Sequence, residues 1–492
     1  MVVKALFSFL EKTEFIQDII KERLFMIVRV SDMLRVLCLS VISLYLLSTL
    51  MPEWEISPLL SILCFIIVVC TFWLAKKFVK ILGGIFLGLG VMLLWTSGSQ
   101  WQNYILAFGP MLDLLTMFTL IPILGIPIKL GRYGEGIQAI IQKRVKTSGQ
   151  LYLMTSGISY FFSIFMNLAT LPMTYYSIRP ALESFPVKNK ERFMSRAISR
   201  GFAMPLIWAP VTPIVGIVIT MTGVSWGSIL PYVIPLSVLG LGLDWFIGSR
   251  KSLKMTLPNL GDSVHETAAA LETSYSSRPG RVFQILAAIA IFNIIVSMAE
   301  TQSSLPFLIL VSLIVIPFAF SWSVLLKKGK EFGDQLIEHF QAFSMSMKDQ
   351  FFIFLSTGFF ISAINFSNAN EILYGWISAF IDAAGIEVFL IILPLIPLGL
   401  AFLGLHPAVS LALMIEGVNP ETIGISPHIL TVAMLSGAVC AFLIGPYNAT
   451  LGLMSNIIKV NSYKVSNWNL PFAGVYVACV MIYLFLLERL LG

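Results

Sequence analysis

Long stretches without lysine or arginine constrain this chain more than any other feature. The longest runs from Lys348 to Lys459 and holds 110 consecutive residues without a basic side chain. Of the 492 residues 57% are hydrophobic and only 12% are charged, against about 25% charged in an ordinary soluble domain. Most of the surface of such a chain has to face lipid. A cytoplasmic enzyme, a secreted disulfide scaffold and a disordered protein are therefore excluded.

The basic residues predict how the chain crosses the membrane, because cytoplasmic loops concentrate positive charge. Four gaps of 40 to 49 residues each fit two spans and an outer turn. They are bounded by Arg35 and Lys76, Lys80 and Lys129, Arg200 and Arg250, and Arg281 and Lys327. The last gap, after Lys464, fits one span. We expect the protein to lie in the plasma membrane, which in a bacterium is the inner membrane. Its N-terminus is expected to be cytoplasmic and its C-terminus extracytoplasmic.

Two gaps do not fit this pattern. The 32 residues between Lys146 and Arg179 are too few for two spans, although both flanks are basic, so residues 147–178 are expected to form a re-entrant hairpin from the cytoplasmic side. The 110-residue gap has room for a span, an outside-entering hairpin at residues 386–416, and a returning span. The sequence therefore predicts two hairpins that enter from opposite sides.

The predicted fold is an all-α polytopic membrane protein with about 11 transmembrane helices and two re-entrant hairpins in an inverted-topology repeat. Each half holds one hairpin and one broken span. The expected segments are a cytoplasmic interfacial helix at 1–35, an extra span at 36–56, a first repeat at 57–248 with a broken span at 201–222, a cytoplasmic linker at 249–281, and a second repeat at 282–492 with a broken span at 428–458.

Helix breakers mark where the working site is expected, because non-helical backbone at membrane depth is tolerated only inside protein or beside a cavity. The breakers are Pro172, Pro205, Pro210, Pro213, Pro407, Gly445 and Pro446. The polar residues beside them, expected to bind solute or ion, are Asn167, Thr170, Thr212, His406, Ser410, Asn448 and Thr450. Simple kinks with hydroxyls satisfying the freed carbonyls are the structural alternative. Their matching places in two halves favour a functional site.

Two titratable residues are candidates for a proton relay. His406 lies at the second hairpin tip, and its ordinary pKa near 6.5 suits proton coupling, although a neutral imidazole bonded to a hairpin carbonyl is the simpler alternative. Asp113 is expected midway along the fourth span, where a carboxylate is usually functional. A hydrogen bond to neighbouring backbone would also account for it.

The run from Ser195 through Pro213 to the segment 223–235 resembles the broken fifth span and following elements of the ion transporter superfamily. This superfamily includes divalent anion/sodium symporters, arsenite permeases and sodium/proton antiporters. The similarity covers about residues 57–490, with the segment 445–461 as the inverted counterpart. It implies a homodimer in which a transport domain slides against a scaffold domain. The symporters carry Ser-Asn-Thr at both hairpin tips, whereas the second tip here, around His406, has no Asn.

The leading functional hypothesis is an elevator-type secondary transporter that moves a small anionic solute coupled to Na⁺ or H⁺. No Lys or Arg is expected inside any span, so helix N-termini after the breaks would hold the anion, and hydroxyl, amide and carbonyl oxygens would hold Na⁺. The alternatives are a cation/proton antiporter of the same fold and, from another class, a non-transporting sensor or assembly subunit.

Other classes of function have little support in the sequence. There is no HExxH motif, and an enzyme is not expected. The five cysteines lie in apolar stretches without metal-ligand spacing, so neither a metal site nor a cofactor is expected. The net charge of +6 is spread over short loops, which argues against nucleic acid. The expected partners are the lipid bilayer, a small solute and a second copy of the chain.

Overall fold

Helices account for the architecture of the chain. The computed structural model describes residues 30–134, 145–183, 185, 187–252, 280–418 and 424–491, and in these residues it holds no named β-strand. Eleven of the described helices are long and apolar enough to cross a membrane. The predicted fold class, an all-α polytopic membrane protein with about 11 spans, is confirmed.

The set of eleven differs in part from the predicted set. It counts Ser148–Glu183, the region of the first predicted hairpin, as one apolar helical segment. It leaves out the predicted broken span at 201–222, because the chain there is divided into helices of 14 and 10 residues, Lys190–Ala203 and Pro213–Thr222, which are each too short to cross a membrane.

The chain divides into two compact units. The first comprises residues 1–115 and 336–367 and includes a helix at 30–50, α2 (Ser57–Leu74), α3 (Lys77–Thr96), α4 (Asn103–Leu106) and most of α16 (Gly329–Phe366). Glycine governs its packing. Gly83 and Gly90 on α3 lie against the rings of Phe352 and Phe359 on α16, where a Cβ would collide with them.

The second unit comprises residues 116–335 and 368–492 and holds both predicted hairpin regions and both predicted broken spans. Its described helices lie between residues 125 and 491. They are α6 (Gly125–Leu130), α8 (Ser148–Met166), α9 (Thr170–Glu183), α10 (Lys190–Ala203), α11 (Pro213–Thr222), α12 (Trp226–Ser252), α14 (Gly280–Gln302), α15 (Phe307–Leu325), α17 (Ala369–Ala384), α18 (Ile386–Ile392), α19 (Leu395–Phe402), α20 (Pro407–Ile415), α22 (Pro427–Ile444), α23 (Ala449–Ile458) and α24 (Ser462–Leu491). α5 (Leu112–Leu120) continues from the first unit into this one.

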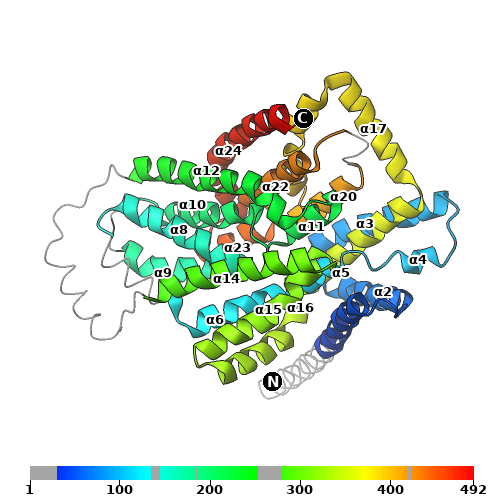
Figure 1. The fold of residues 1–492 in the computed structure, drawn as a ribbon, viewed down its shortest axis with the longest axis horizontal. Coiled ribbons are helices and arrows are strands. Elements are labelled where there is room, and N and C mark those ends of the chain that lie inside the picture. The colour runs from blue at the N-terminus through cyan, green and yellow to red at the C-terminus, as the bar shows by residue number, and fades with distance from the viewer. Residues whose placement is uncertain are drawn as a thin grey trace, which may run out of the picture. The chain divides into compact units, whose positions relative to one another are not determined.

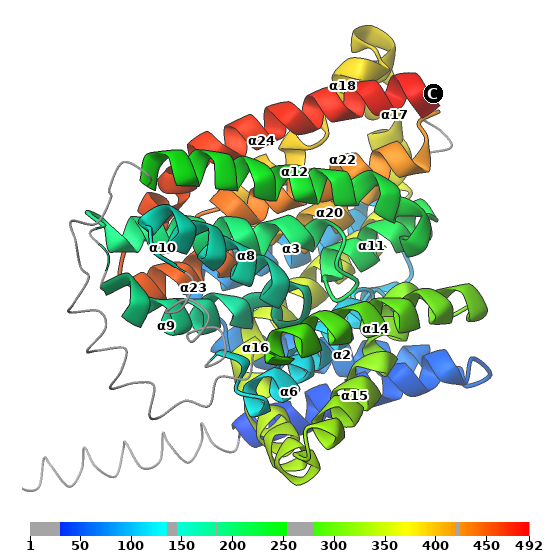
Figure 2. The same cartoon turned by 60° about the vertical axis from the view of Figure 1, so that its left-hand side comes forward.

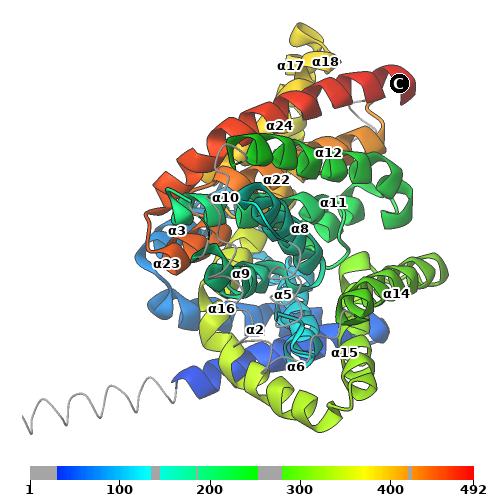
Figure 3. The same ribbon diagram turned by 90° about the vertical axis from the view of Figure 1, so that its left-hand side faces the viewer.

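The core of the second unit is built around α22, which is buried along nearly its whole length. α22 packs against α24, α19 and α11 (Figures 1 and 2). α8 packs closely against α10 and α12, and it lies beside α9 in all three views (Figure 3). A helix buried on every side is apolar all round, as α22 is, so its breaks and polar groups need partners within the protein.

Several predicted boundaries move. The first described span covers 30–50 rather than 36–56, so the last residues of the predicted interfacial helix belong to it, and residues 1–29 lie outside the described part. α12 continues to Ser252, and most of the predicted linker at 249–281 also lies outside. The second hairpin region contains three short helices, α18, α19 and α20. A bend of 117° at Gly385 separates α17 from α18 and α19.

Candidate solute site at two helix breaks

The first break separates α10 from α11. After α10 a 3₁₀ turn, η3 (Met204–Ile207), is followed by non-helical residues up to Thr212. Two side chains of α12 donate hydrogen bonds to carbonyls that the break leaves without helical partners. Ser237 Oγ donates to Met204 O at 2.8 Å, and Trp226 Nε1 donates to Trp208 O at 2.8 Å. Pro205 lies in the 3₁₀ turn and Pro210 in the gap, so both act where the sequence places a break. The break is therefore held open from outside.

Thr212 is the N-cap residue of α11, but its side chain does not cap the helix. Its Oγ1 is buried, and it has no hydrogen-bond partner among the described residues. Pro213 follows at the first helical position and brings no N–H. The N-terminus of α11 thus offers a buried hydroxyl and the positive end of a helix dipole, neither of which the protein itself uses.

The second break, between α22 and α23, is closed mainly by one of its own side chains, while Ser466 of α24 donates to Ile444 O at 2.5 Å. Asn448 Nδ2 donates to Ala441 O at 2.8 Å and Phe442 O at 3.1 Å, and Asn448 Oδ1 accepts from Leu451 N at 2.8 Å. The last carbonyls of α22 and the first amides of α23 therefore share one amide group. Gly445 is the C-cap residue of α22, with Pro446 directly after it. Asn448, predicted to bind solute or ion, has a structural role in this arrangement.

Ten buried hydroxyls have no hydrogen-bond partner in the described part of the chain, and six of them lie on α9, α10 and α23 or at the N-cap of α11. These six are Thr170, Thr174, Ser195, Ser199, Thr212 and Thr450. Five of them lie on α9, α10 and α23, three helices that pack against one another. Buried polar groups in native proteins nearly always have a partner, so such a concentration indicates places where water, an ion or a solute binds. Hydroxyl oxygens suit a hard cation such as Na⁺.

The two hairpin regions turn at residues with unusual backbone. Asn167 has a φ of 45° where α8 passes into η2 (Asn167–Ala169), and Pro172 lies within the first turn of α9 rather than at the break. In the second region Gly404 has a φ of 92° just before α20. Left-handed backbone reverses a chain sharply, and Asn and Gly tolerate it best.

His406 is the N-cap residue of α20 and is followed by Pro407 at the first helical position. Its Nδ1 accepts from Ala408 N at 3.2 Å. The ring packs edge-on against Phe118 and Phe442, with centroids 5.7 and 5.8 Å away. The imidazole therefore uses one nitrogen to cap a helix, which is close to the simpler of the two sequence-based alternatives.

The predicted site residues fall on two helix pairs. α11, which begins after Thr212, packs against α20, which carries Ser410. α23, which carries Thr450, packs against α9, which carries Thr170. Each helix that follows a break thus lies against the return helix of a hairpin region from the other half of the sequence. Ser410 Oγ donates to His406 O at 3.3 Å and is buried.

A buried basic residue lies on α10, which is not among the candidate spans. Arg200, on α10, is 1% exposed and pairs with the fully buried Asp244 of α12, with Nη1 3.1 Å from Oδ1. The carboxylate also accepts from Tyr152 Oη and Ser156 Oγ on α8, both at 2.7 Å. This network joins three helices, and its four polar partners satisfy one another, as a buried ion pair requires.

Arg200 is also tied to α24. Its Nε donates to Asn469 Oδ1 and its Nη2 to Trp468 O, both at 3.1 Å, and its guanidinium lies 4.6 Å from the centre of the Phe472 ring. Sequence reasoning missed this cluster because it treated Arg200 as the edge of a loop. The available signal was Asp244, an acid within an apolar span that needs a buried partner.

Asp113 does not lie midway along a span. It is in the first turn of α5, and its Oδ1 accepts from Leu114 N at 2.7 Å. A carboxylate at a helix N-terminus is stabilised by the helix dipole and by free amides. The hydrogen bond to neighbouring backbone that the sequence left open is present.

Among the described residues, no group of three or more His, Cys, Asp or Glu side chains could hold a metal ion. The oxygen atoms available near the breaks are hydroxyls and carbonyls.

Comparison with solved structures identifies the fold. MtrF from Neisseria gonorrhoeae, of a class of antimetabolite efflux pumps, superposes with a TM-score of 0.55 at 13% sequence identity, over 86% of this chain and 98% of that chain. The YdaH transporter from Alcanivorax borkumensis, which has an unusual topology, gives a TM-score of 0.55 at 14% identity, over 82% of this chain and 97% of that chain.

No protein-family model and no curated protein sequence matches the chain. At 13 to 14% identity, the similarity to the two solved transporters shows a shared fold. The shared fold extends over 98% and 97% of those two chains and over 86% and 82% of this one.

Proposed function

We propose that this protein is a secondary active transporter that moves a small anionic solute coupled to Na⁺ or H⁺. The observation that carries the proposal is the pair of helix breaks inside one buried unit, with hydroxyls beside them that no protein group uses. Transporters commonly bind their solutes at such discontinuous helices. The shared fold with MtrF and YdaH supports the proposal, since both are membrane transporters.

The N-terminus of α11 is the proposed anion site. Helix N-termini bind anions through free amides and the helix dipole, without any basic side chain. Thr212 Oγ1 adds a donor that is buried and unpaired. The nearest buried cation on the preceding helix, Arg200, is already neutralised by Asp244. A carboxylate or phosphate group would thus be held by backbone and hydroxyl together.

The hydroxyls on α9, α10 and α23 are the proposed site of the coupling ion. Thr170, Thr174 and Thr450 are buried and lack partners, as do Ser195 and Ser199. Na⁺ is a hard cation that prefers oxygen ligands. H⁺ would be carried by water among the same hydroxyls.

The pairing of α11 with α20 and of α23 with α9 supports an inverted-topology repeat. The second unit contains both breaks and both hairpin regions, so it is the proposed transport domain, and the first unit is the proposed scaffold of an elevator. We also propose that the protein forms a homodimer, that both hairpins are re-entrant, and that the chain belongs to the ion transporter superfamily.

Uptake into proteoliposomes tests the proposal. The purified full-length chain would be given imposed Na⁺ and pH gradients together with labelled phosphate, acetate, succinate and benzoate in turn. We expect gradient-dependent uptake of at least one anion by the wild type and loss of most of it in Thr212→Val. A wild-type flux indifferent to both gradients, or a Thr212→Val flux equal to wild type, would overturn the assignment.

A further inference from the structure

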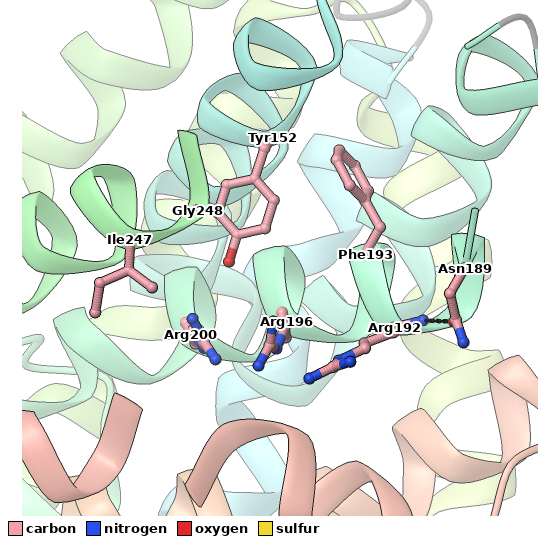
Figure 4. Close-up of a pocket in the computed structure, with 8 residues that line it drawn as sticks. All are labelled: Tyr152, Asn189, Arg192, Phe193, Arg196, Arg200, Ile247 and Gly248. Carbon is pink, nitrogen blue, oxygen red and sulfur yellow. Dashed lines mark hydrogen bonds between the residues drawn. The ribbon is translucent and has the colours of Figure 1, made fainter. Parts of the chain in front are cut away.

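A basic pocket lies along α10. It encloses about 260 Å³ between α8, α10 and α12 (Figure 4). Its lining residues are Tyr152, Asn189, Arg192, Phe193, Arg196, Arg200, Ile247 and Gly248. That volume exceeds by several-fold the roughly 30 Å³ that one water occupies in the liquid, so the pocket admits a polyatomic ion.

Three arginines at a spacing of four line one face of α10, and Figure 4 shows their guanidinium groups side by side. Exposure falls along this row: Arg192 is exposed, Arg196 is half-buried and Arg200 is buried. Residues four apart are neighbours on a helix surface, where like charges repel. Only the innermost charge, that of Arg200, has a carboxylate partner, Asp244.

Two positive charges in the pocket remain uncompensated. Arg196 uses Nε to donate to Trp468 O at 2.9 Å, which leaves its two terminal nitrogens available. The guanidinium of Arg192 forms no ion pair or hydrogen bond with another described residue. α10 lies outside the candidate spans. Burial, together with the charges of Arg200 and Arg192, lowers the pKa of Arg196 to about 10, so it stays protonated at neutral pH.

We propose that this pocket binds a phosphate group, presented by an acidic phospholipid headgroup or by a soluble phosphate ion. Two guanidinium forks match the oxygens of one phosphate group, and its negative charge offsets the positive charge of the arginines. Next to the pocket, Trp245 and Phe246 of α12 are 38% and 54% exposed. This apolar surface continues from the pocket wall at Ile247 and suits the acyl chains of a lipid. Basic pockets between helices are a known way to hold such headgroups.

Thermal unfolding of the full-length protein in micelles tests the pocket. Dioleoyl-phosphatidylglycerol is titrated against dioleoyl-phosphatidylcholine, and inorganic phosphate against chloride at matched ionic strength. We expect one of the two phosphate sources to raise Tm. We also expect R192Q/R196Q to need an at least about tenfold higher concentration of that ligand for the same rise, because each lost charged donor weakens binding.

The control variant is R179Q/R489Q, which removes the same two charges elsewhere: Arg179 pairs with Glu183, and Arg489 is exposed on α24. It should respond to the ligand as the wild type does. A response only to phosphatidylglycerol assigns a lipid, and a response to inorganic phosphate assigns a soluble ligand. If R192Q/R196Q does not fold, R192Q alone carries the test, because its exposed side chain supports no other described residue. No shift in the wild type, or equal loss in the control variant, overturns the proposal.

Discussion

The two broken helices solve the same problem in different ways. At the second break Asn448, a residue of the break itself, binds both the end of α22 and the start of α23. At the first break the carbonyls are held by Ser237 and Trp226, which come 33 and 18 residues later than the groups they bind, and the cap residue Thr212 holds nothing. The second break is bonded by its own Asn448 with help from Ser466 of α24, whereas both side chains that support the first break come from α12.

The two breaks therefore differ in which polar groups remain available to a solute. At the second break the Asn448 amide already binds the start of α23, whereas at the first break the N-terminus of α11 has no side-chain cap. The contrast supports the proposal that the first break binds the solute. Variants of the buried ion pair, of the two breaks and of Asp113 separate these roles, from the largest expected loss of stability to the smallest.

Replacing Arg200 should destabilise the unit most. Arg200→Leu leaves Asp244 buried without its cation, and such a change costs about 3–5 kcal/mol. Thermal or denaturant unfolding in micelles would measure it. The double variant Arg200→Leu with Asp244→Leu should recover much of the loss, since no unpaired charge remains. Equal losses in the single and double variants would contradict the role given to this ion pair.

Replacing Asn448 should have the next largest effect. Asn448→Ala leaves Phe442 O and the amide of Leu451 without partners, while Ala441 O still accepts from Gly445 N, at a cost of about 1–3 kcal/mol. The matched control is Thr450→Val, two residues later, whose hydroxyl has no partner to lose. We expect Tm to fall in the first variant and to stay near wild type in the second. If both behave alike, Asn448 does not close the break.

Trp226→Phe tests the outside support of the first break. It removes the Nε1 donor to Trp208 O, while a ring remains to stack on Phe307. Hydrogen bonds between helices in membranes contribute about 0.6 kcal/mol on average, so a small fall in Tm is expected. A drop as large as that of Asn448→Ala would show that both breaks depend on single side chains to the same degree.

The break positions could be predicted from the sequence, because Pro205, Pro210, Pro213 and Pro446 cannot continue a helix. What each polar residue does there could not. Thr212 and Asn448 occupy equivalent places, yet only the folded chain shows that one side chain reaches back to the preceding helix.

Burial of Arg200 was equally hidden. Its charge is paired with a residue 44 positions later, and a sequence rule that assigns basic residues to loops places it at the surface. Long-range partners of this kind arise from tertiary packing, which local patterns do not encode.

Asp113→Asn should change stability and transport least. The carboxylate accepts one local hydrogen bond, which an amide oxygen can replace, and Asp113 belongs to the unit that holds neither break. Uptake and Tm should both stay close to wild type. Loss of proton exchange in this variant would favour the cation/proton antiporter alternative instead.

The most direct test of the account compares transport in Thr212→Val and Thr212→Ser. Currents after an anion concentration jump would be recorded from proteoliposomes on a solid-supported membrane, with Tm measured on the same preparations. We expect Thr212→Val to lose most of the current while its free energy of unfolding stays within about 0.5 kcal/mol of the wild-type value. Thr212→Ser should retain the current. Full current in Thr212→Val, at unchanged Tm, would contradict the assignment of the first break as the solute site.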